Sequence, residues 1–235
     1  MDKIVILSGA GLSAQSGIST FRDSGGLWEK YDVKEICSDG CLDWNYDETI
    51  NFYNLRRNDI QDKHPNYAHE KISKLKKEFP DKIEVITQNV DNLLERAGCQ
   101  DILHLHGFLP EIRCMKCDTI QNISYDSQDE SNGKCMKCGG KMRPNIVFFG
   151  EEAPRYKQMY NILEECGLLI IIGTSGNVID MNLLSQYADF SILNNLTPSD
   201  VIIEEIFDQT YYEEATTAID KIENDIRSYL DNGTL

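Results

Sequence analysis

Short runs of aliphatic residues, each ending in a polar residue or a glycine, recur along this chain of 235 residues. Such runs are typical of strands buried on both faces of a parallel sheet. Stretches with helical periodicity separate them, and Pro80 and Gly98 end two of these stretches. We therefore expect an α/β fold of the doubly wound, Rossmann-like type. The expected strands are 4–7, 83–87, 168–172 and 191–193, and the expected helices are 66–79, 91–97 and about 213–230.

Four of the eight cysteines form two close pairs, Cys114-x2-Cys117 and Cys135-x2-Cys138, with seventeen residues between the pairs. This spacing is typical of a zinc site with four thiolate ligands, because each pair places two sulfurs on one tight turn. Four thiolates leave no open coordination position, so we expect a structural ion. We expect residues 111–143 to form a small zinc-binding module, inserted into a larger domain made of residues 1–110 and 144–235.

The net charge of −16 disfavours nucleic acid as the main partner, because that binding depends on Lys and Arg neutralising phosphates. It disfavours an anionic membrane surface for the same reason. The longest apolar run, 168–172, is too short to span a bilayer, and the first residues do not resemble a leader peptide. We expect a soluble cytoplasmic protein; its oligomeric state is left open, and a monomer is compatible with the sequence.

The first expected strand runs into Gly9-Ala10-Gly11-Leu12-Ser13-Ala14, which satisfies the Gly-x-Gly-x-x-Gly/Ala pattern of dinucleotide-binding loops. Glycines there let the backbone approach a pyrophosphate, although the pattern alone fits an ordinary tight turn equally well. In NAD-dependent dehydrogenases this glycine pattern is followed, about twenty residues later, by a second strand that ends in Asp or Glu. Residues 17–28 are instead polar and contain several glycines, which predicts a loop and not a strand, so a hydride-transferring enzyme is disfavoured.

Polar side chains follow the expected strand 83–87, and the next apolar run ends in His104-Leu105-His106-Gly107. Ligands of open α/β sheets bind beyond the carboxyl ends of the strands, so we expect these side chains to line a site. A histidine taken alone is more often structural, but its place at a strand end favours His106 as a general base. His104 is expected to lie on the opposite face of the strand and is the weaker candidate. The polar residues after strand 83–87 are Gln88, Asn89 and Asp91.

Together these motifs resemble those of the sirtuins, a family of NAD-dependent protein-lysine deacylases. The resemblance implies an enzyme that transfers an acyl group from lysine to ADP-ribose and releases nicotinamide. It implies NAD and one structural zinc ion as cofactors, and acylated-lysine proteins or peptides as partners. The matching segments are Gly9-Ala10-Gly11-x-Ser13, Thr20-Phe21-Arg22, Gln88-Asn89-x-Asp91, His106-Gly107, the four cysteines, Arg143 to Glu151, Gly173-Thr174-Ser175 and Asn195.

The resemblance also implies roles for individual residues. His106 is the base that acts on a ribose hydroxyl, and Asn89 and Asp91 hold the nicotinamide and the ribose. Thr20, Phe21 and Arg22 belong to a loop that covers the cofactor. The other implied cofactor contacts are Gly9, Ala10, Gly11, Ser13, Gly17, Gln88, Gly173, Thr174, Ser175, Asn195 and Ala215. The peptide is implied to lie between two loops, in contact with Val147, Phe148, Gly150, Glu151, Asn177 and Val178.

Tyr53 and Arg56 are three residues apart in a stretch expected to be helical from near Asp47, so they share one face. They resemble the Tyr-x-x-Arg pair of the bacterial-type sirtuin class that removes succinyl, malonyl and glutaryl groups. A guanidinium and a phenol can bind a terminal carboxylate by charge-assisted hydrogen bonds. The alternative interpretation is that Arg56 and Arg57 are solvated residues of the helix.

The sequence departs from the family pattern in three places: Phe108 replaces a small or polar residue, Asp180 a proline, and Glu213-Glu214 a Gly-Pro pair. The last departure concerns the adenine contact implied for Ala215. Other functions stay open, namely an NAD-dependent protein ADP-ribosyltransferase or a non-catalytic NAD-binding module. A metal-dependent hydrolase is disfavoured, because four cysteine ligands close the zinc site.

Overall fold

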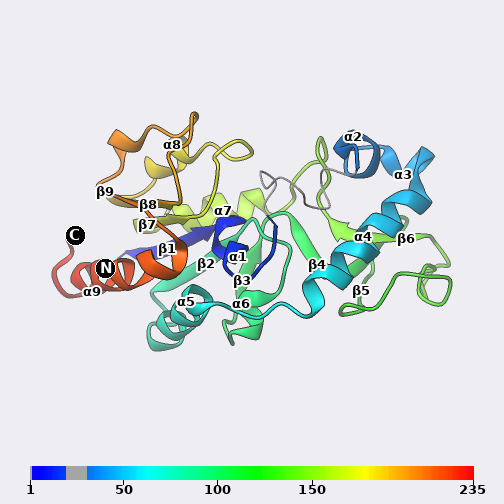
Figure 1. Ribbon diagram of the computed structural model, residues 1–235, viewed down its shortest axis with the longest axis horizontal. Coiled ribbons are helices and arrows are strands. Elements are labelled where there is room, and N and C mark those ends of the chain that lie inside the picture. The colour runs from blue at the N-terminus through cyan, green and yellow to red at the C-terminus, as the bar shows by residue number, and fades with distance from the viewer. Residues whose placement is uncertain (1, 20–30) are drawn as a thin grey trace.

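A six-stranded parallel sheet forms the centre of the larger lobe in the computed structural model, which describes residues 2–19 and 31–235 (Figure 1). The strand order is β3-β2-β1-β7-β8-β9, and all five pairings are parallel. The chain winds outward from β1 to β3 and then returns to continue on the other side of β1, so the switch point lies between β1 and β7. This confirms the expected doubly wound fold. The strands are β1 (Lys3–Ser8), β2 (Ile83–Thr87), β3 (Ile102–His104), β7 (Cys166–Ile172), β8 (Phe190–Asn195) and β9 (Gln209–Tyr212).

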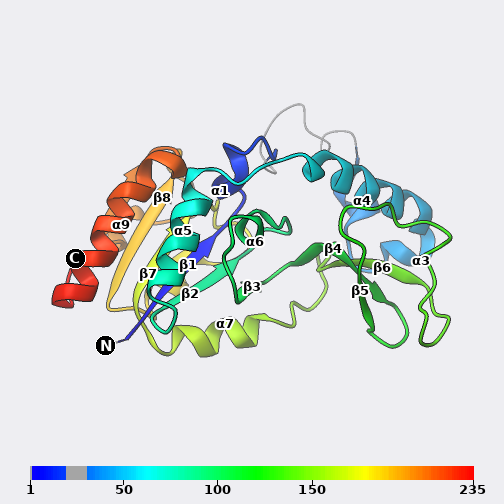
Figure 2. The same ribbon diagram turned by 90° about the horizontal axis from the view of Figure 1, so that it is seen from below.

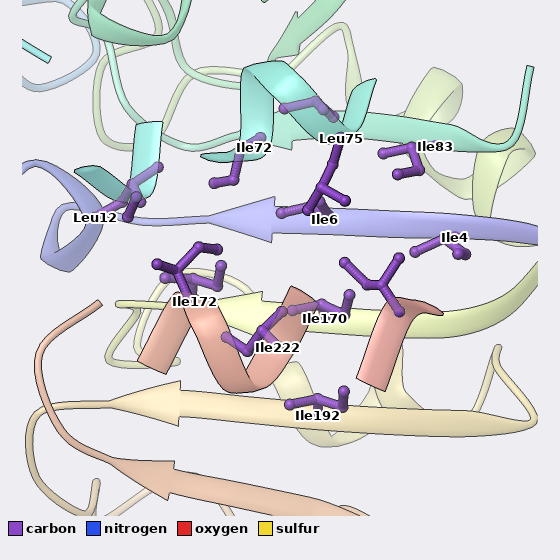
Figure 3. Close-up of a cluster of buried hydrophobic side chains, with 14 of the residues drawn as sticks. Ile4, Ile6, Leu12, Ile72, Leu75, Ile83, Ile170, Ile172, Ile192 and Ile222 are labelled. Carbon is purple, nitrogen blue, oxygen red and sulfur yellow. The ribbon is translucent and has the colours of Figure 1, made fainter. Parts of the chain in front are cut away.

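Helices cover both faces of this sheet (Figure 2). Alternate residues of a strand point to opposite faces, so Ile4 and Ile6 of β1 pack with α5 and α9, whereas Val5 and Leu7 pack with α7 and α8. Figure 3 shows the first of these layers. The helices are α5 (Tyr67–Glu78), α7 (Tyr156–Leu163), α8 (Met181–Ser185) and α9 (Ala215–Asn232), with the short α1 (Gly11–Ala14), α6 (Leu93–Arg96) and the 3-10 turn η2 (Glu204–Ile206) at strand ends.

Helix α5 begins where the sequence indicates, because the Asn66 side chain accepts hydrogen bonds from the N–H groups of Ala68 and His69. Helix α9 begins at Ala215 and not near Glu213, since the N–H of Glu213 bonds to the carbonyl oxygen of Asn195 and continues the strand-like path of β9. Within the described ranges, no helix combines the length and the apolar character needed to cross a membrane.

The smaller lobe lies at one end of the molecule, beyond the carboxyl ends of the strands (Figure 2). Its antiparallel sheet, in the order β5-β4-β6, packs against α4 through Phe52, Tyr53, Leu109 and Ile146. The sheet extends from Gly107 to Ile146, and the division at residues 111–143 stays a prediction. The elements are α2 (Val33–Ile36), α3 (Cys41–Trp44), α4 (Tyr46–Gln61), β4 (Gly107–Cys114), β5 (Ile120–Asn122) and β6 (Met142–Ile146).

Candidate active site

Two glycine loops meet at the carboxyl edge of the sheet, where β1 and β7 end side by side. The N–H of Gly9 donates to the carbonyl oxygen of Ile172 at 2.9 Å, and that of Gly11 donates to Gly173 at 2.8 Å. A Cβ on Gly9 would lie 2.7 Å from the oxygen of Gly173, and one on Gly11 would lie 2.6 Å from its Cα. Only glycine permits so close an approach. The switch point therefore presents a backbone surface, which suits a bound pyrophosphate.

A polar network lies directly beside these loops. The amide of Asn89 donates to the carbonyl oxygen of Gly9 at 3.0 Å and to Ser13 Oγ at 3.2 Å. Ser13 Oγ in turn donates to Asp91 Oδ2 at 3.0 Å, while Asp91 Oδ1 accepts from the N–H of Leu93. Burial raises the pKa of Asp91, and the hydrogen bonds from Leu93 and Ser13 oppose that rise. Residues from the ends of β1 and β2 are thus held in one cluster, as the sequence predicts.

His69 of α5 belongs to the same network, although sequence reasoning does not select it. Its Nε2 lies 3.4 Å from Ser13 Oγ, and its Nδ1 lies 2.9 Å from Asn66 Oδ1. Burial lowers the pKa of His69 to about 4, so the ring is neutral at neutral pH. The available sequence signal is the capping pattern Asn66-x-x-His69, which identifies a helix start and gives no indication of the contact with Ser13.

His106 lies between β3 and β4, close to the end of β2. Its Nδ1 is 3.2 Å from the carbonyl oxygen of Gln88, and its Nε2 is 2.9 Å from the hydroxyl of Tyr156. Burial lowers the pKa of His106, which favours the neutral imidazole that a general base requires. The next residue, Gly107, has φ +97°, and a Cβ there would lie 2.1 Å from the oxygen of Asn145. Only glycine fits between the two strands at this point.

His104 has a different environment from His106, but the reason expected from strand alternation is wrong, because residues two apart on a strand share a face. The strand β3 ends at His104, and the chain turns at residues 105–106 before β4 begins. Its Nδ1 lies 2.9 Å from the carbonyl oxygen of Asn89, and its Nε2 lies 2.6 Å from Glu95 Oε1. The ring of Phe108 packs against it at 4.7 Å between centroids. The aromatic residue that departs from the family pattern at position 108 therefore covers His104, which in turn supports the backbone of Asn89.

The remaining expected cofactor residues follow the same edge of the sheet. Gln88 Nε2 donates to Thr174 Oγ1 at 3.1 Å, which joins the end of β2 to the second glycine loop. Asn195 ends β8 and is buried, and the buried Ala215 begins α9. Ala10, Gly17 and Ser175 lie in the adjoining loops and helix start, whereas Thr20, Phe21 and Arg22 lie outside the described residues.

Of the proposed acyl-binding pair on α4, Tyr53 contacts the substrate loop. Tyr53 is buried, its ring stacks on Phe148 with centroids 5.6 Å apart, and its hydroxyl lies 3.0 Å from Cys37 Sγ. Arg56 is half-buried, and burial lowers its pKa. Arg57 is fully buried, so the alternative of two solvated arginines is wrong for this residue.

The loop after β6 is held by an ion pair. Arg143 Nη1 and Nη2 donate to Glu151 Oε1 and Oε2 at 2.5 and 3.1 Å, and Oε2 also accepts from the N–H of Phe148 at 2.9 Å. Burial raises the pKa of Glu151, but these hydrogen bonds outweigh it and hold the pKa below its ordinary value. Both carboxylate oxygens thus serve the loop itself, so we interpret Glu151 as shaping the peptide site and not as contacting the peptide.

The two expected peptide loops contain exposed residues. Val147 is half-buried and its N–H donates to the carbonyl oxygen of His106 at 2.9 Å, while Gly150 is exposed with φ +91°. In the second loop Asn177 Nδ2 donates to Ser175 Oγ, and Val178 is exposed. Asp180, the departure from proline, caps α8 by accepting from the N–H groups of Asn182 and Leu183.

The four cysteines that the spacing groups together lie at one place in the smaller lobe. Their four sulfurs are all within 4.8 Å of one another, and three of the pairs are 3.3, 3.5 and 3.7 Å apart. Four sulfurs at the usual zinc–sulfur distance form a tetrahedron with edges of about 3.8 Å. These side chains therefore fit a structural zinc ion. The residues that could hold the ion are Cys114, Cys117, Cys135 and Cys138.

A parallel sheet with glycine loops at its switch point, a histidine at a strand end and a four-cysteine module defines a nucleotide-binding α/β protein with a zinc site. The Sir2 family model matches residues 9–180. An NAD-dependent protein deacylase of Campylobacter jejuni is 49% identical over 236 residues, covering 100% of both chains. One of Helicobacter hepaticus is 42% identical over 255 residues, covering 97% of this chain and 99% of that protein.

Solved structures agree with the sequence comparisons. A Sir2 homologue in complex with NAD has a TM-score of 0.84 at 30% identity, covering 97% of this chain and 90% of that chain. A mutant Sir2 homologue in complex with ADP-ribose has a TM-score of 0.85 at 30% identity, with coverage of 98% and 94%. The chain belongs to the Sir2 family, the sirtuins.

Proposed function

We propose that this protein is an NAD-dependent protein-lysine deacylase. The observation that carries the proposal is the position of His106, a half-buried imidazole held beside the Gln88-Asn89-x-Asp91 loop and the two glycine loops. The names of the relatives from Campylobacter and Helicobacter support the same activity. Two cofactors belong to the proposal: NAD at the switch point and one structural zinc ion on the four cysteines.

Bound NAD supplies a ribose carbon that is open to attack, with nicotinamide as the leaving group. His106 accepts a proton from a ribose hydroxyl at Nε2 and can return it later, because its lowered pKa leaves the imidazole neutral at working pH. Asn89 and Asp91 are held in place by Gly9 and Ser13, so they meet the nicotinamide end without rearrangement. The glycine loops admit the phosphates.

The test is incubation with acetyl-lysine and succinyl-lysine peptides, with and without NAD, followed by detection of free nicotinamide and deacylated peptide. We expect both products only with NAD, and their loss in His106→Ala. Turnover without NAD would contradict the proposal. Transfer of ADP-ribose to a protein acceptor, detected by mass spectrometry, would favour the ADP-ribosyltransferase alternative.

We further propose that the acyl groups removed from lysine include those with a terminal carboxylate, such as succinyl and malonyl groups. Tyr53 and Arg56 are adjacent on α4, and Tyr53 stacks on Phe148 of the expected peptide loop. In Arg56→Met we expect the ratio of kcat/KM for succinyl-lysine over acetyl-lysine peptide to fall by tenfold or more, since a charge-assisted bidentate bond is lost. An unchanged ratio would contradict the carboxylate pocket.

The proposed setting is the cytoplasm, with acylated proteins as substrates. None of the eight cysteines, all within the described residues, forms a disulfide, and four of them are spaced for a metal, which suits a reducing compartment.

A further inference from the structure

Within the described residues, a tyrosine hydroxyl lies within hydrogen-bond distance of His106, the proposed base. Tyr156 Oη lies 2.9 Å from His106 Nε2, with ring centroids 6.0 Å apart and planes at 46°. Tyr156 is the first residue of α7 and is half-buried. It belongs to none of the motifs that identify the family, so its contact with His106 emerges only from the fold.

The second ring nitrogen fixes the direction of this hydrogen bond when the ring is neutral. Nδ1 faces the carbonyl oxygen of Gln88 at 3.2 Å, and a carbonyl can only accept. Nδ1 therefore carries the proton, and the lone pair of the neutral ring is on Nε2. The hydroxyl of Tyr156 donates to that lone pair, which is the one that must accept the proton from the ribose.

We propose that Tyr156 is a positioning residue that takes the place of the ribose hydroxyl on His106 before NAD binds, and yields this place when NAD binds. The inference rests on the proposed function, in which His106 Nε2 acts on that hydroxyl. Each state then keeps the lone pair occupied, by the phenol in the free enzyme and by the ribose in the complex, so the ring holds one orientation throughout.

The surroundings of Tyr156 allow this exchange. Met159 and Leu163 of α7 are fully buried against the sheet, so the helix is anchored while its first residue is half-buried. Among the described residues, the one hydrogen bond of the phenol oxygen is that with His106. Arg155, the residue before it, donates through Nη1 to the carbonyl oxygen of His104 at 3.3 Å and fixes the backbone on that side. The phenol can therefore swing aside without moving α7.

The exchange lowers the affinity for NAD, because one neutral hydrogen bond is broken for the one that forms. In Tyr156→Phe we expect the Kd for NAD, measured by calorimetry without peptide, and the KM for NAD to fall about two- to tenfold. We expect kcat to stay within about twofold, since the complex no longer uses the phenol. A merely structural role would instead weaken binding or lower the melting temperature.

Tyr160→Phe is the matched control, one turn further along α7. Its ring packs against Tyr187 with centroids 5.8 Å apart, so this variant is expected to bind NAD like the wild type. The second control repeats Tyr156→Phe in a His106→Ala background. There the gain in NAD affinity is expected to vanish, because no imidazole is present for the phenol and the ribose to compete for.

Unchanged or weaker binding of NAD by Tyr156→Phe would overturn the proposal. A loss of kcat beyond tenfold would also overturn it, because the phenol would then take part in the reaction itself. These failures differ from a failure of the proposed function. If the wild type neither binds nor cleaves NAD, the deacylase assignment fails; if it does both and the variant matches it, only the role of Tyr156 fails.

Discussion

Two neighbouring arginines in α4 have different surroundings. Arg57 is completely buried, with its Nε donating to the carbonyl oxygen of Leu109 at 3.0 Å and its Nη1 to Asn54 Oδ1 at 3.1 Å. It thereby ties α4 to β4. Burial lowers the pKa of Arg57 to about 10, which still leaves it charged at neutral pH. Arg56 is half-buried and lies three residues after Tyr53 on the helix.

Replacing Arg57 by Met is expected to lower the free energy of unfolding by about 2–3 kcal/mol, because hydrogen bonds from a charged donor are lost and a buried carbonyl is left unpaired. Urea denaturation measures the change. Arg56→Met, on the next residue, is the control and is expected to change acyl selectivity with little effect on stability. Equal losses of stability in the two variants would contradict this division.

His69 gives the protein a pH-dependent stability. In the unfolded chain a histidine titrates near pH 6.5, whereas burial lowers the pKa of His69 in the folded protein to about 4. Between these values the unfolded chain binds a proton that the folded protein does not. The contribution of His69 to stability is therefore fully present above pH 6.5 and is lost as the pH falls toward 4.

Between pH 7 and pH 4.5 the wild type is expected to lose about 2–3 kcal/mol more unfolding free energy than His69→Asn, which has no imidazole to protonate. Chemical denaturation at the two pH values tests this. His64→Asn, at an exposed position, controls for the loss of a histidine as such. The hypothesis fails if the wild type and His69→Asn lose the same amount.

At the scale of elements, the loop after β6 connects the zinc module to the base. Arg143, within β6, and Glu151, at the far end of the loop, are joined by two hydrogen bonds, and the guanidinium of Arg143 also lies 4.1 Å from the ring centroid of Phe148. Between them, Val147 bonds to His106. The ion pair thus closes the loop into one shape and places its middle beside the base.

Glu151→Gln weakens the ion pair with Arg143, so the loop is ordered only when the peptide binds. Part of the binding free energy is then spent on ordering the loop, and we expect the KM for acyl-peptide to rise about three- to tenfold. The KM for NAD is expected to change by less than about twofold, because the cofactor loops belong to other elements. Steady-state kinetics with each substrate varied separately distinguishes the two. Glu152→Gln, on the exposed neighbouring residue, is expected to behave as wild type.

Patterns in the sequence predict the elements more fully than the contacts between them. The strand expected at 83–87 forms with the same bounds, because a buried parallel strand needs little beyond an aliphatic run. The residues of the glycine, Gln-Asn-x-Asp and cysteine motifs come together as expected, because each motif depends on a local turn after a strand. Tyr156 and His69 cannot be found this way, since their contacts with His106 and Ser13 join residues 50 and 56 positions apart.

Over the whole molecule, two strands link the zinc module to the active site. β4 starts at Gly107, next to the base, and ends at Cys114, the first zinc ligand. β6 pairs with it from Met142, opposite Cys114, to Ile146, opposite Gly107, and leads directly into the substrate loop. The module has a small core of its own, in which Cys114 and Cys135 are buried with Ile112 and Met142. A core of this size depends on its metal for stability.

Removing the zinc is therefore expected to abolish deacylation while the six-stranded sheet persists. Without the ion, the strands β4 and β6 are no longer held together at the end where Cys114 lies opposite Met142. We then expect the loop that carries Val147 to lose its hydrogen bond to His106. Cys117→Ser is expected to lose both bound zinc, measured with a chelating dye, and activity, whereas far-ultraviolet circular dichroism changes little. Cys99→Ser removes a buried thiol outside the cluster and is expected to keep both. Full activity in zinc-free protein would show that β4 and β6 hold the active site without the metal.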